Sequence, residues 1–192
     1  MASNRFAGDW RTRYRISFED LQVAGTNELL NEVTFEEAQA QNLLVAALGS
    51  IPEEEVQKAL GVPWIMIGSD AILTGSSNHH PRGAGTFSRV LGRYVRELGV
   101  LSLPDALAKM TILPARRLEG MIPAMATKGR LRRGADADVV VFDPTVVGDR
   151  ATIAAPNTMS VGFSHVFVDG QAVLSNGDVQ RDVLPGRALR SA

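Results

Sequence analysis

Cysteine is absent from the 192 residues of this chain. Disulfides and thiolate metal ligands are therefore excluded within it. Long apolar runs are also missing, since none approaches the roughly 20 residues needed to span a bilayer. The first residues, Met1 to Arg5, lack the apolar core of a signal peptide. Together these absences predict a soluble, cytoplasmic protein.

An excess of charge of one sign is lacking as well. The formal net charge is −1, with 45% hydrophobic and 21% charged residues. Such a chain has no long-range field to attract nucleic acid or an anionic membrane, so we expect neither as a partner. The apolar fraction is ordinary for a globular protein and suffices for a sizeable core.

The first part of the chain alternates between strand and helix patterns. A capping box at Thr34 and Glu37 predicts a helix to about Gln41, and the apolar run 43–48 predicts a buried strand. A second helix pattern starts at Ser50, and a second buried-strand pattern covers 64–68. This alternation predicts an α/β fold with a parallel sheet and outer helices.

A polar loop at residues 74–84 precedes a strongly amphipathic helix. Apolar side chains recur there at three- and four-residue spacing, which predicts a face packed on the core. They are Phe87, Val90, Leu91, Tyr94, Val95 and Leu98. Further helices are expected from Ser102 and from Thr111.

Beyond residue 125 the pattern changes to strands joined by tight turns. Residues 139–142 predict a buried strand, and 166–174 predict a hairpin around Asp169-Gly170. We therefore place a boundary between an α/β part, 1–125, and a small antiparallel part, 126–192. Two parallel strands alone do not form a stable sheet. Either another chain completes the sheet, or this sequence is a fragment of a longer polypeptide.

Asp70 is the strongest candidate for a catalytic residue. It follows the second apolar strand and opens the polar loop. In (β/α)₈ barrels the catalytic groups lie at this edge of the sheet. A carboxylate there can act as a general base or as a metal ligand. The alternative is an aspartate that merely caps a turn.

The loop after Asp70 contains His79, His80 and Arg82. Adjacent histidines rarely converge on one metal ion, so a loop-ordering or substrate-facing role is favoured for them. Arg82 can bind a carboxylate through two parallel hydrogen bonds, although it could be an ordinary surface arginine. The remaining histidine, His165, is assigned no role.

Several stretches resemble the N-acyl-D-amino-acid deacylases of the amidohydrolase superfamily. Residues 64–70 resemble the last barrel strand of the superfamily, and 80–97 look like the segment that follows it in these deacylases. Residues 128–143 are similar to a tail shared by many amidohydrolases. The resemblance covers about residues 43–190, and 12–21 more weakly resemble a D-glutamate-type branch.

The resemblance implies a fold, a cofactor and residue roles. The family folds as a (β/α)₈ barrel plus a small β-sandwich, with one or two zinc ions. Residues 1–125 would then hold the last strands and helices of the barrel, and 126–192 the sandwich. Asp70 matches the aspartate that takes the proton of the attacking hydroxide and passes it to the leaving amine, and it would also be a metal ligand. Arg82 matches the arginine that binds the substrate carboxylate, and His80 would lie beside the substrate.

The departures from the family pattern are equally informative. The His-x-His motif of the first strand is absent, and so are the ligands of the middle strands. Asp70 alone cannot hold a zinc ion, so we expect the isolated chain to be inactive. Three hypotheses remain: a fragment or subunit of a deacylase acting on N-acyl-D-amino acids, a non-catalytic module that self-associates or binds a partner chain, and a cyclic amidase of dihydroorotase or hydantoinase type.

Overall fold

The computed structural model describes residues 8–23, 26, 28–43, 45–47, 51–71, 73–74, 77–78 and 80–190. The chain forms two compact units. The first contains the chain up to Lys58, Asp70–Ala84 and Ala151–Thr158, and the second contains Ala59–Ser69, Gly85–Arg150 and the chain from Met159 onward. The boundary that the sequence suggested near residue 125 stays a prediction.

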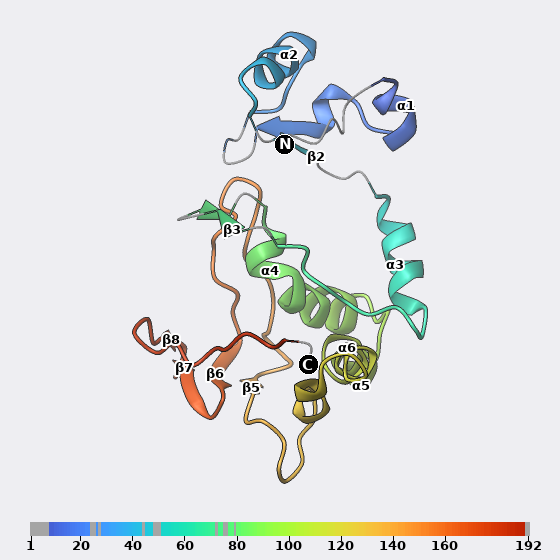
Figure 1. Ribbon diagram of the computed structural model, residues 1–192. Coiled ribbons are helices and arrows are strands. Elements are labelled where there is room, and N and C mark those ends of the chain that lie inside the picture. The colour runs from blue at the N-terminus through green and yellow to red at the C-terminus, as the bar shows by residue number, and fades with distance from the viewer. Residues whose placement is uncertain are drawn as a thin grey trace. The chain divides into compact units, whose positions relative to one another are not determined.

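The first unit is built on short elements around an aromatic core. They are α1 (Trp10–Tyr14), the 3₁₀ turn η1 (Phe18–Asp20), β1 (Leu21–Val23), α2 (Glu32–Ala40), β2 (Val45–Ala47), β3 (Leu73–Thr74) and β4 (Ser77–Asn78) (Figure 1). Strands β1 and β2 pair antiparallel, as do β3 and β4. Trp10, Leu21 and Phe35 are buried in the core between the helices and the β1–β2 pair.

Two expectations for this unit need correction. Helix α2 begins before Thr34, because the Asn31 side chain accepts the Thr34 N–H at 3.0 Å and Thr34 Oγ1 accepts the Asn31 N–H at 2.9 Å. The capping box thus lies one turn earlier than predicted. Strand β2 is only half buried and antiparallel, so the predicted parallel sheet is wrong for this strand.

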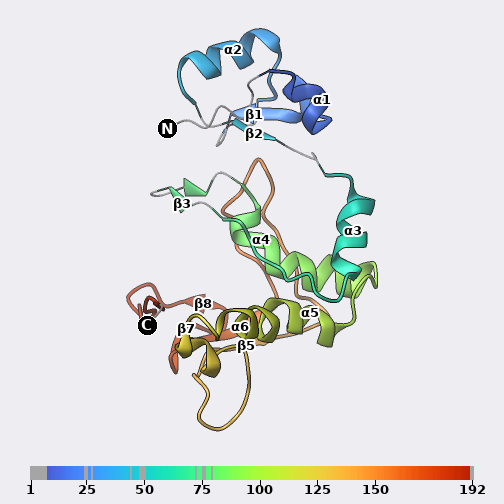
Figure 2. The ribbon, with the colours of Figure 1, turned by 45° about the vertical axis from the view of Figure 1, so that its right-hand side comes forward.

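Helices dominate the middle of the chain (Figures 1 and 2). They are α3 (Glu53–Gly61), α4 (Arg82–Arg89), the π-helix η2 (Val90–Glu97), α5 (Leu103–Met110), α6 (Ile112–Leu118) and the 3₁₀ turn η3 (Pro123–Thr127). Helices α5 and α6 lie side by side, and α5 also packs against η2. The predicted apolar face is confirmed at its centre, where Val90, Leu91 and Tyr94 are buried, while Phe87 and Leu98 at its ends are exposed.

The C-terminal region forms the predicted antiparallel unit. Its four strands pair in sequence order: β5 (Val139–Phe142), β6 (Phe163–Val168), β7 (Gln171–Ser175) and β8 (Asp178–Val179). Asp169 and Gly170 join β6 to β7 with φ values of 50° and 79°, as a tight hairpin turn requires. Among the residues described here, β5 to β8 form one sheet, and no second sheet packs on it. Strand β5 is half exposed and not buried, unlike the prediction.

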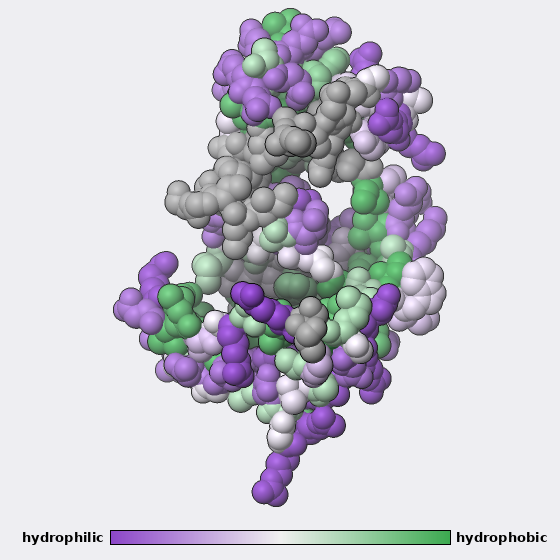
Figure 3. All heavy atoms as spheres, viewed as in Figure 1, coloured by the Kyte–Doolittle hydropathy of each residue, from purple (hydrophilic) through white to green (hydrophobic). Residues whose placement is uncertain are grey.

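Hydrophilic side chains cover much of the face shown in Figure 3, with hydrophobic patches between them. Within the described ranges, no helix is both long and apolar enough to cross a membrane. A cytoplasmic location stays a prediction. The (β/α)₈ barrel also stays a prediction, since the described part of the chain contains only antiparallel strand pairs.

Candidate active site

No described strand pairs with the segment that leads to Asp70. Exposure alternates along it, with Ile65, Ile67 and Ser69 half buried and the residues between them exposed. This is the period of a strand, yet no described strand pairs with residues 64–68, so the predicted strand is absent. A strand buried on both faces of a sheet needs neighbours on both sides. Here the Ile67 N–H instead donates to the Lys109 carbonyl at 3.1 Å.

Asp70 and Arg82 are brought together by the structure. Asp70 Oδ2 lies 3.1 Å from Arg82 Nη1. Asp70 has a φ of 50°, the left-handed conformation that aspartate tolerates better than most residues. Its side chain is 82% exposed and that of Arg82 36%. The alternative, an aspartate that caps a turn, stays open beside the catalytic hypothesis.

His80 lies beside this pair at the start of α4. Its Nδ1 accepts the backbone N–H of Arg82 at 3.1 Å. That hydrogen bond requires an unprotonated Nδ1 and places the ring proton on Nε2. Burial lowers the pKa of His80, and the Arg82 guanidinium lowers it further, while Asp70 acts in the opposite direction. His80 is therefore neutral at pH 7 and orders the first turn of α4.

The chain contains two other histidines, His79 and His165. His79 lies outside the described residues. His165 is on β6, where its ring stacks on Phe167 at a centroid distance of 6.0 Å. The three residues predicted for the site thus come together, but their roles stay predictions.

A complete metal site is not formed by these residues. Across the described ranges, no group of three or more His, Asp and Glu side chains could hold a metal ion. Zinc sites use four ligands, or three ligands plus water. Asp70 can supply one ligand at most, and His80 Nδ1 already accepts a hydrogen bond. The donor set of the described residues therefore does not fit a zinc ion, and it supports no chemical step at a metal.

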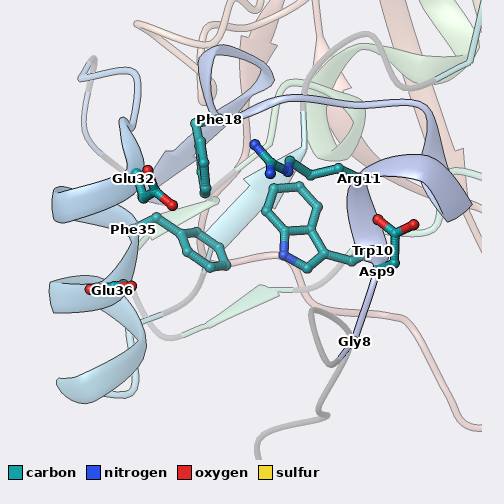
Figure 4. Close-up of a pocket in the computed structure, with 8 residues that line it drawn as sticks. All are labelled: Gly8, Asp9, Trp10, Arg11, Phe18, Glu32, Phe35 and Glu36. Carbon is teal, nitrogen blue, oxygen red and sulfur yellow. The ribbon is translucent and has the colours of Figure 1, made fainter.

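A cavity of about 270 Å³ lies elsewhere, against the aromatic core of the first unit. Figure 4 shows its lining, in which Trp10, Phe18 and Phe35 face one another with Arg11 beside them. The three ring centroids are 5.2–5.4 Å apart. None of the predicted site residues lines this cavity. This cluster leaves no signal in the sequence, because its members lie on three short elements without a shared period.

The chain belongs to the amidohydrolase family, which it matches over residues 14–174. It is 47% identical over 141 residues to N-acyl-D-glutamate deacylase of Alcaligenes xylosoxydans xylosoxydans. This alignment covers 73% of this chain and 27% of the deacylase. Identity to D-aminoacylase of the same organism is 44% over 121 residues, covering 63% of this chain and 24% of the relative.

Solved structures agree with this assignment. A D-aminoacylase structure, described for its binuclear metal center, superposes with a TM-score of 0.71 at 35% identity. The match covers 81% of this chain and 31% of the D-aminoacylase chain. N-acyl-D-glutamate deacylase from Bordetella bronchiseptica, complexed with zinc and a phosphonate inhibitor, gives a TM-score of 0.67 at 34% identity. This match covers 94% of this chain and 39% of the Bordetella chain. The chain thus spans about a quarter of the length of its curated relatives.

Proposed function

We propose that this chain supplies the proton-transferring aspartate and the carboxylate-binding arginine of a zinc-dependent hydrolase for N-acyl-D-amino acids. The observation that carries the proposal is the 3.1 Å contact between Asp70 and Arg82. A base and a guanidinium at this distance suit a substrate whose reacting amide lies close to a free carboxylate. The relatives that act on N-acyl-D-amino acids support this substrate class.

Arg82 and Asp70 have different roles in this proposal. Arg82 binds the substrate carboxylate with two parallel hydrogen bonds and so orients the scissile amide toward Asp70. Asp70 accepts a proton from the attacking water and returns it to the leaving nitrogen. His80 keeps the first turn of α4, and with it Arg82, in place through its bond to the Arg82 N–H.

The Asp70–Arg82 ion pair does not block substrate binding. Because Asp70 is 82% exposed, water screens the pair, and such pairs contribute about 0–1 kcal/mol. A substrate carboxylate can therefore replace Asp70 on Arg82 at little cost. Asp70 is then released for proton transfer when the substrate is bound.

The zinc ions belong, in this proposal, to the complete enzyme rather than to these 192 residues alone. Since the described residues hold no ligand set, the isolated chain is expected to show no zinc-dependent deacylation. Metal analysis and an assay with N-acyl-D-amino acids test this directly. Deacylation by the isolated chain, abolished by a chelator, would show that the ligand set is complete after all.

A chimera tests the proposed activity. In the A. xylosoxydans N-acyl-D-glutamate deacylase, the matching segment is replaced by the 141 aligned residues of this chain. We expect the chimera to hydrolyse N-acyl-D-amino acids but not their L-isomers. Arg82→Met in the chimera should raise KM for the acyl amino acid by about tenfold or more, because a charge-assisted hydrogen bond contributes roughly 1.5–3 kcal/mol. A folded, zinc-loaded chimera without activity would refute the proposal.

A second candidate function is a module that binds another copy or a partner chain. It is favoured by the segment before Asp70, where Trp64 is 77% and Met66 38% exposed. Exposed apolar side chains promote association. Light scattering at increasing concentration tests this, and a constant monomer mass would argue against self-association.

A further inference from the structure

The cavity of about 270 Å³ in the first unit has an aromatic wall (Figure 4). Its lining residues all fall within 8–36, in one compact unit. The wall is formed by Trp10, Phe18 and Phe35, whose ring centroids lie 5.2–5.4 Å apart. At that spacing the rings touch one another, so a ligand lies against them and not between them. Trp10 and Phe35 are each 7% exposed, whereas Phe18 is half buried and is the most accessible ring.

Carboxylates line much of the rest of this cavity. Glu32 and Glu36 are four residues apart on α2, so they lie on the same side of the helix. Asp9 stands at the start of α1, where hydrogen bonds from the Thr12 side chain and N–H lower the pKa of its carboxyl group. Against these three carboxylates the lining contains one cation, Arg11. The cavity is therefore negatively charged and attracts cations.

Arg11 shows how a cation can bind at this wall. Its guanidinium carbon lies 5.1 Å from the centroid of the Phe18 ring, within the roughly 6 Å of a cation–π contact. Figure 4 shows the guanidinium group beside the rings. Because Arg11 is exposed, water competes for its guanidinium group and the contact is weak. A cationic ligand can therefore displace Arg11 from the ring.

The chemistry of the lining favours an organic cation over a metal ion. Across the described ranges, no group of three or more His, Asp and Glu side chains could hold a metal ion. An alkylated ammonium ion does not need such a ligand set, since it binds to the faces of aromatic rings. The volume of about 270 Å³ is below the roughly 300 Å³ at which pockets for drug-sized ligands begin, so the ligand is small.

We propose that this cavity binds a small quaternary ammonium ion of the size of choline, which replaces Arg11 on the Phe18 ring. The methyl groups of the ligand contact the aromatic wall, and the carboxylates of Asp9, Glu32 and Glu36 balance its charge. The ligand differs in charge from an N-acyl amino acid, so this site does not depend on the function proposed above.

The fluorescence of Trp10 reports directly on the cavity. The test uses the full chain with Trp64→Phe, which leaves Trp10 as the single tryptophan. Choline is titrated at constant ionic strength, with sodium chloride as the reference salt. Dimethylbutanol, the uncharged carbon analogue of choline, has the same shape and tests whether the charge is needed. We expect a saturable change with choline and an affinity about tenfold lower for dimethylbutanol, because the attraction of the rings for a cation is lost.

Two pairs of charge variants test the lining. Glu36→Gln should weaken choline binding by about threefold or more, and Arg11→Gln should tighten it by a similar factor, because a competing like charge is removed. Each has a matched control outside the lining: Glu37→Gln on α2, and Arg13→Gln on α1, where the guanidinium lies over Tyr14. At about 0.15 M salt, which screens exposed charges outside the cavity, both controls should stay within about twofold of the parent.

The opposite signs expected for Glu36→Gln and Arg11→Gln separate binding from damage to the fold, which would weaken binding in both. The proposal is overturned if choline gives no saturable change, if dimethylbutanol binds as tightly as choline, or if Arg11→Gln weakens binding. If a variant does not fold, the comparison of choline with dimethylbutanol in the parent decides. None of these readouts uses an N-acyl amino acid, so their failure is distinguishable from failure of the proposed enzymatic function.

Discussion

Individual side chains of the site were accessible to sequence reasoning because their chemistry is local. Asp70 follows an apolar run, and Arg82 lies in the polar loop after it, so both could be singled out. The structure brings the two side chains into contact, and their roles stay predictions. The cavity lined by Trp10, Phe18 and Phe35 could not be singled out in this way, because its rings come from three short elements.

A functional aspartate should be dispensable for stability. Asp70→Asn removes the ion pair with Arg82 but retains a residue that tolerates the left-handed conformation at φ 50°. Since Asp70 is 82% exposed, the free energy of unfolding should fall by less than about 1 kcal/mol. Denaturation with urea measures this. A loss of several kcal/mol would assign Asp70 a structural role.

Lys128 forms ion pairs with two carboxylates of the C-terminal region. Its Nζ lies 2.8 Å from Asp136 Oδ2 and 2.6 Å from Asp138 Oδ2. The hydrogen bond from Lys128 lowers the pKa of Asp136. Burial acts to raise the pKa of Asp138, but the Asp169 N–H and Lys128 outweigh it and the pKa is lowered. Both carboxylates are thus easier to ionise in the folded chain than in the unfolded chain.

The sign of the pH dependence follows from these shifts. Above the unfolded pKa of 3.8 the stabilisation is fully present, and it is lost as the pH falls through the lower folded values. The urea concentration at the midpoint of unfolding should therefore fall when the pH is lowered below about 4. Lys128→Met should flatten this drop, while Lys58→Met, the same change at an exposed lysine on α3, should not. An equal acid slope in the wild type and Lys128→Met would contradict the account.

At the scale of elements, helices and hairpins were predictable and strand partners were not. The amphipathic face around Val90 and the turn at Asp169-Gly170 depend on neighbours within a few residues. The partner of an apolar run depends on distant chain. Residues 43–48 were therefore expected in a parallel sheet, but β2 pairs antiparallel with β1, and 64–68 pair with no described strand. A period identifies a strand conformation, not its neighbours.

The helix that follows Arg82 depends on one close approach. A Cβ added to Gly92 in η2 would lie 2.8 Å from the Val147 carbonyl oxygen. Val147 is 1% exposed and cannot move aside without repacking. Gly92→Ala should therefore destabilise the chain by about 1–3 kcal/mol. Gly120→Ala is the control, because nothing lies within 4 Å of its added Cβ. Equal unfolding midpoints for the two variants would contradict the close packing.

At the scale of the whole molecule, family membership is established and the catalytic assembly is a proposal. The chain matches the amidohydrolase family over residues 14–174 but aligns with only 27% of the N-acyl-D-glutamate deacylase. The sequence predicted the family, since family membership depends on motifs. It could not predict the extent of the sheet, because the described strands make only antiparallel pairs within this chain.

The most direct test of the account is the kcat/KM of the chimeric deacylase with and without Asp70→Asn. Asparagine cannot accept the proton, so kcat/KM should fall by about 10²–10⁴-fold while folding and zinc content stay unchanged. A chimera in which Asp70→Asn retains the kcat/KM of its parent would show that Asp70 does not transfer the proton, and the account would fail at its centre.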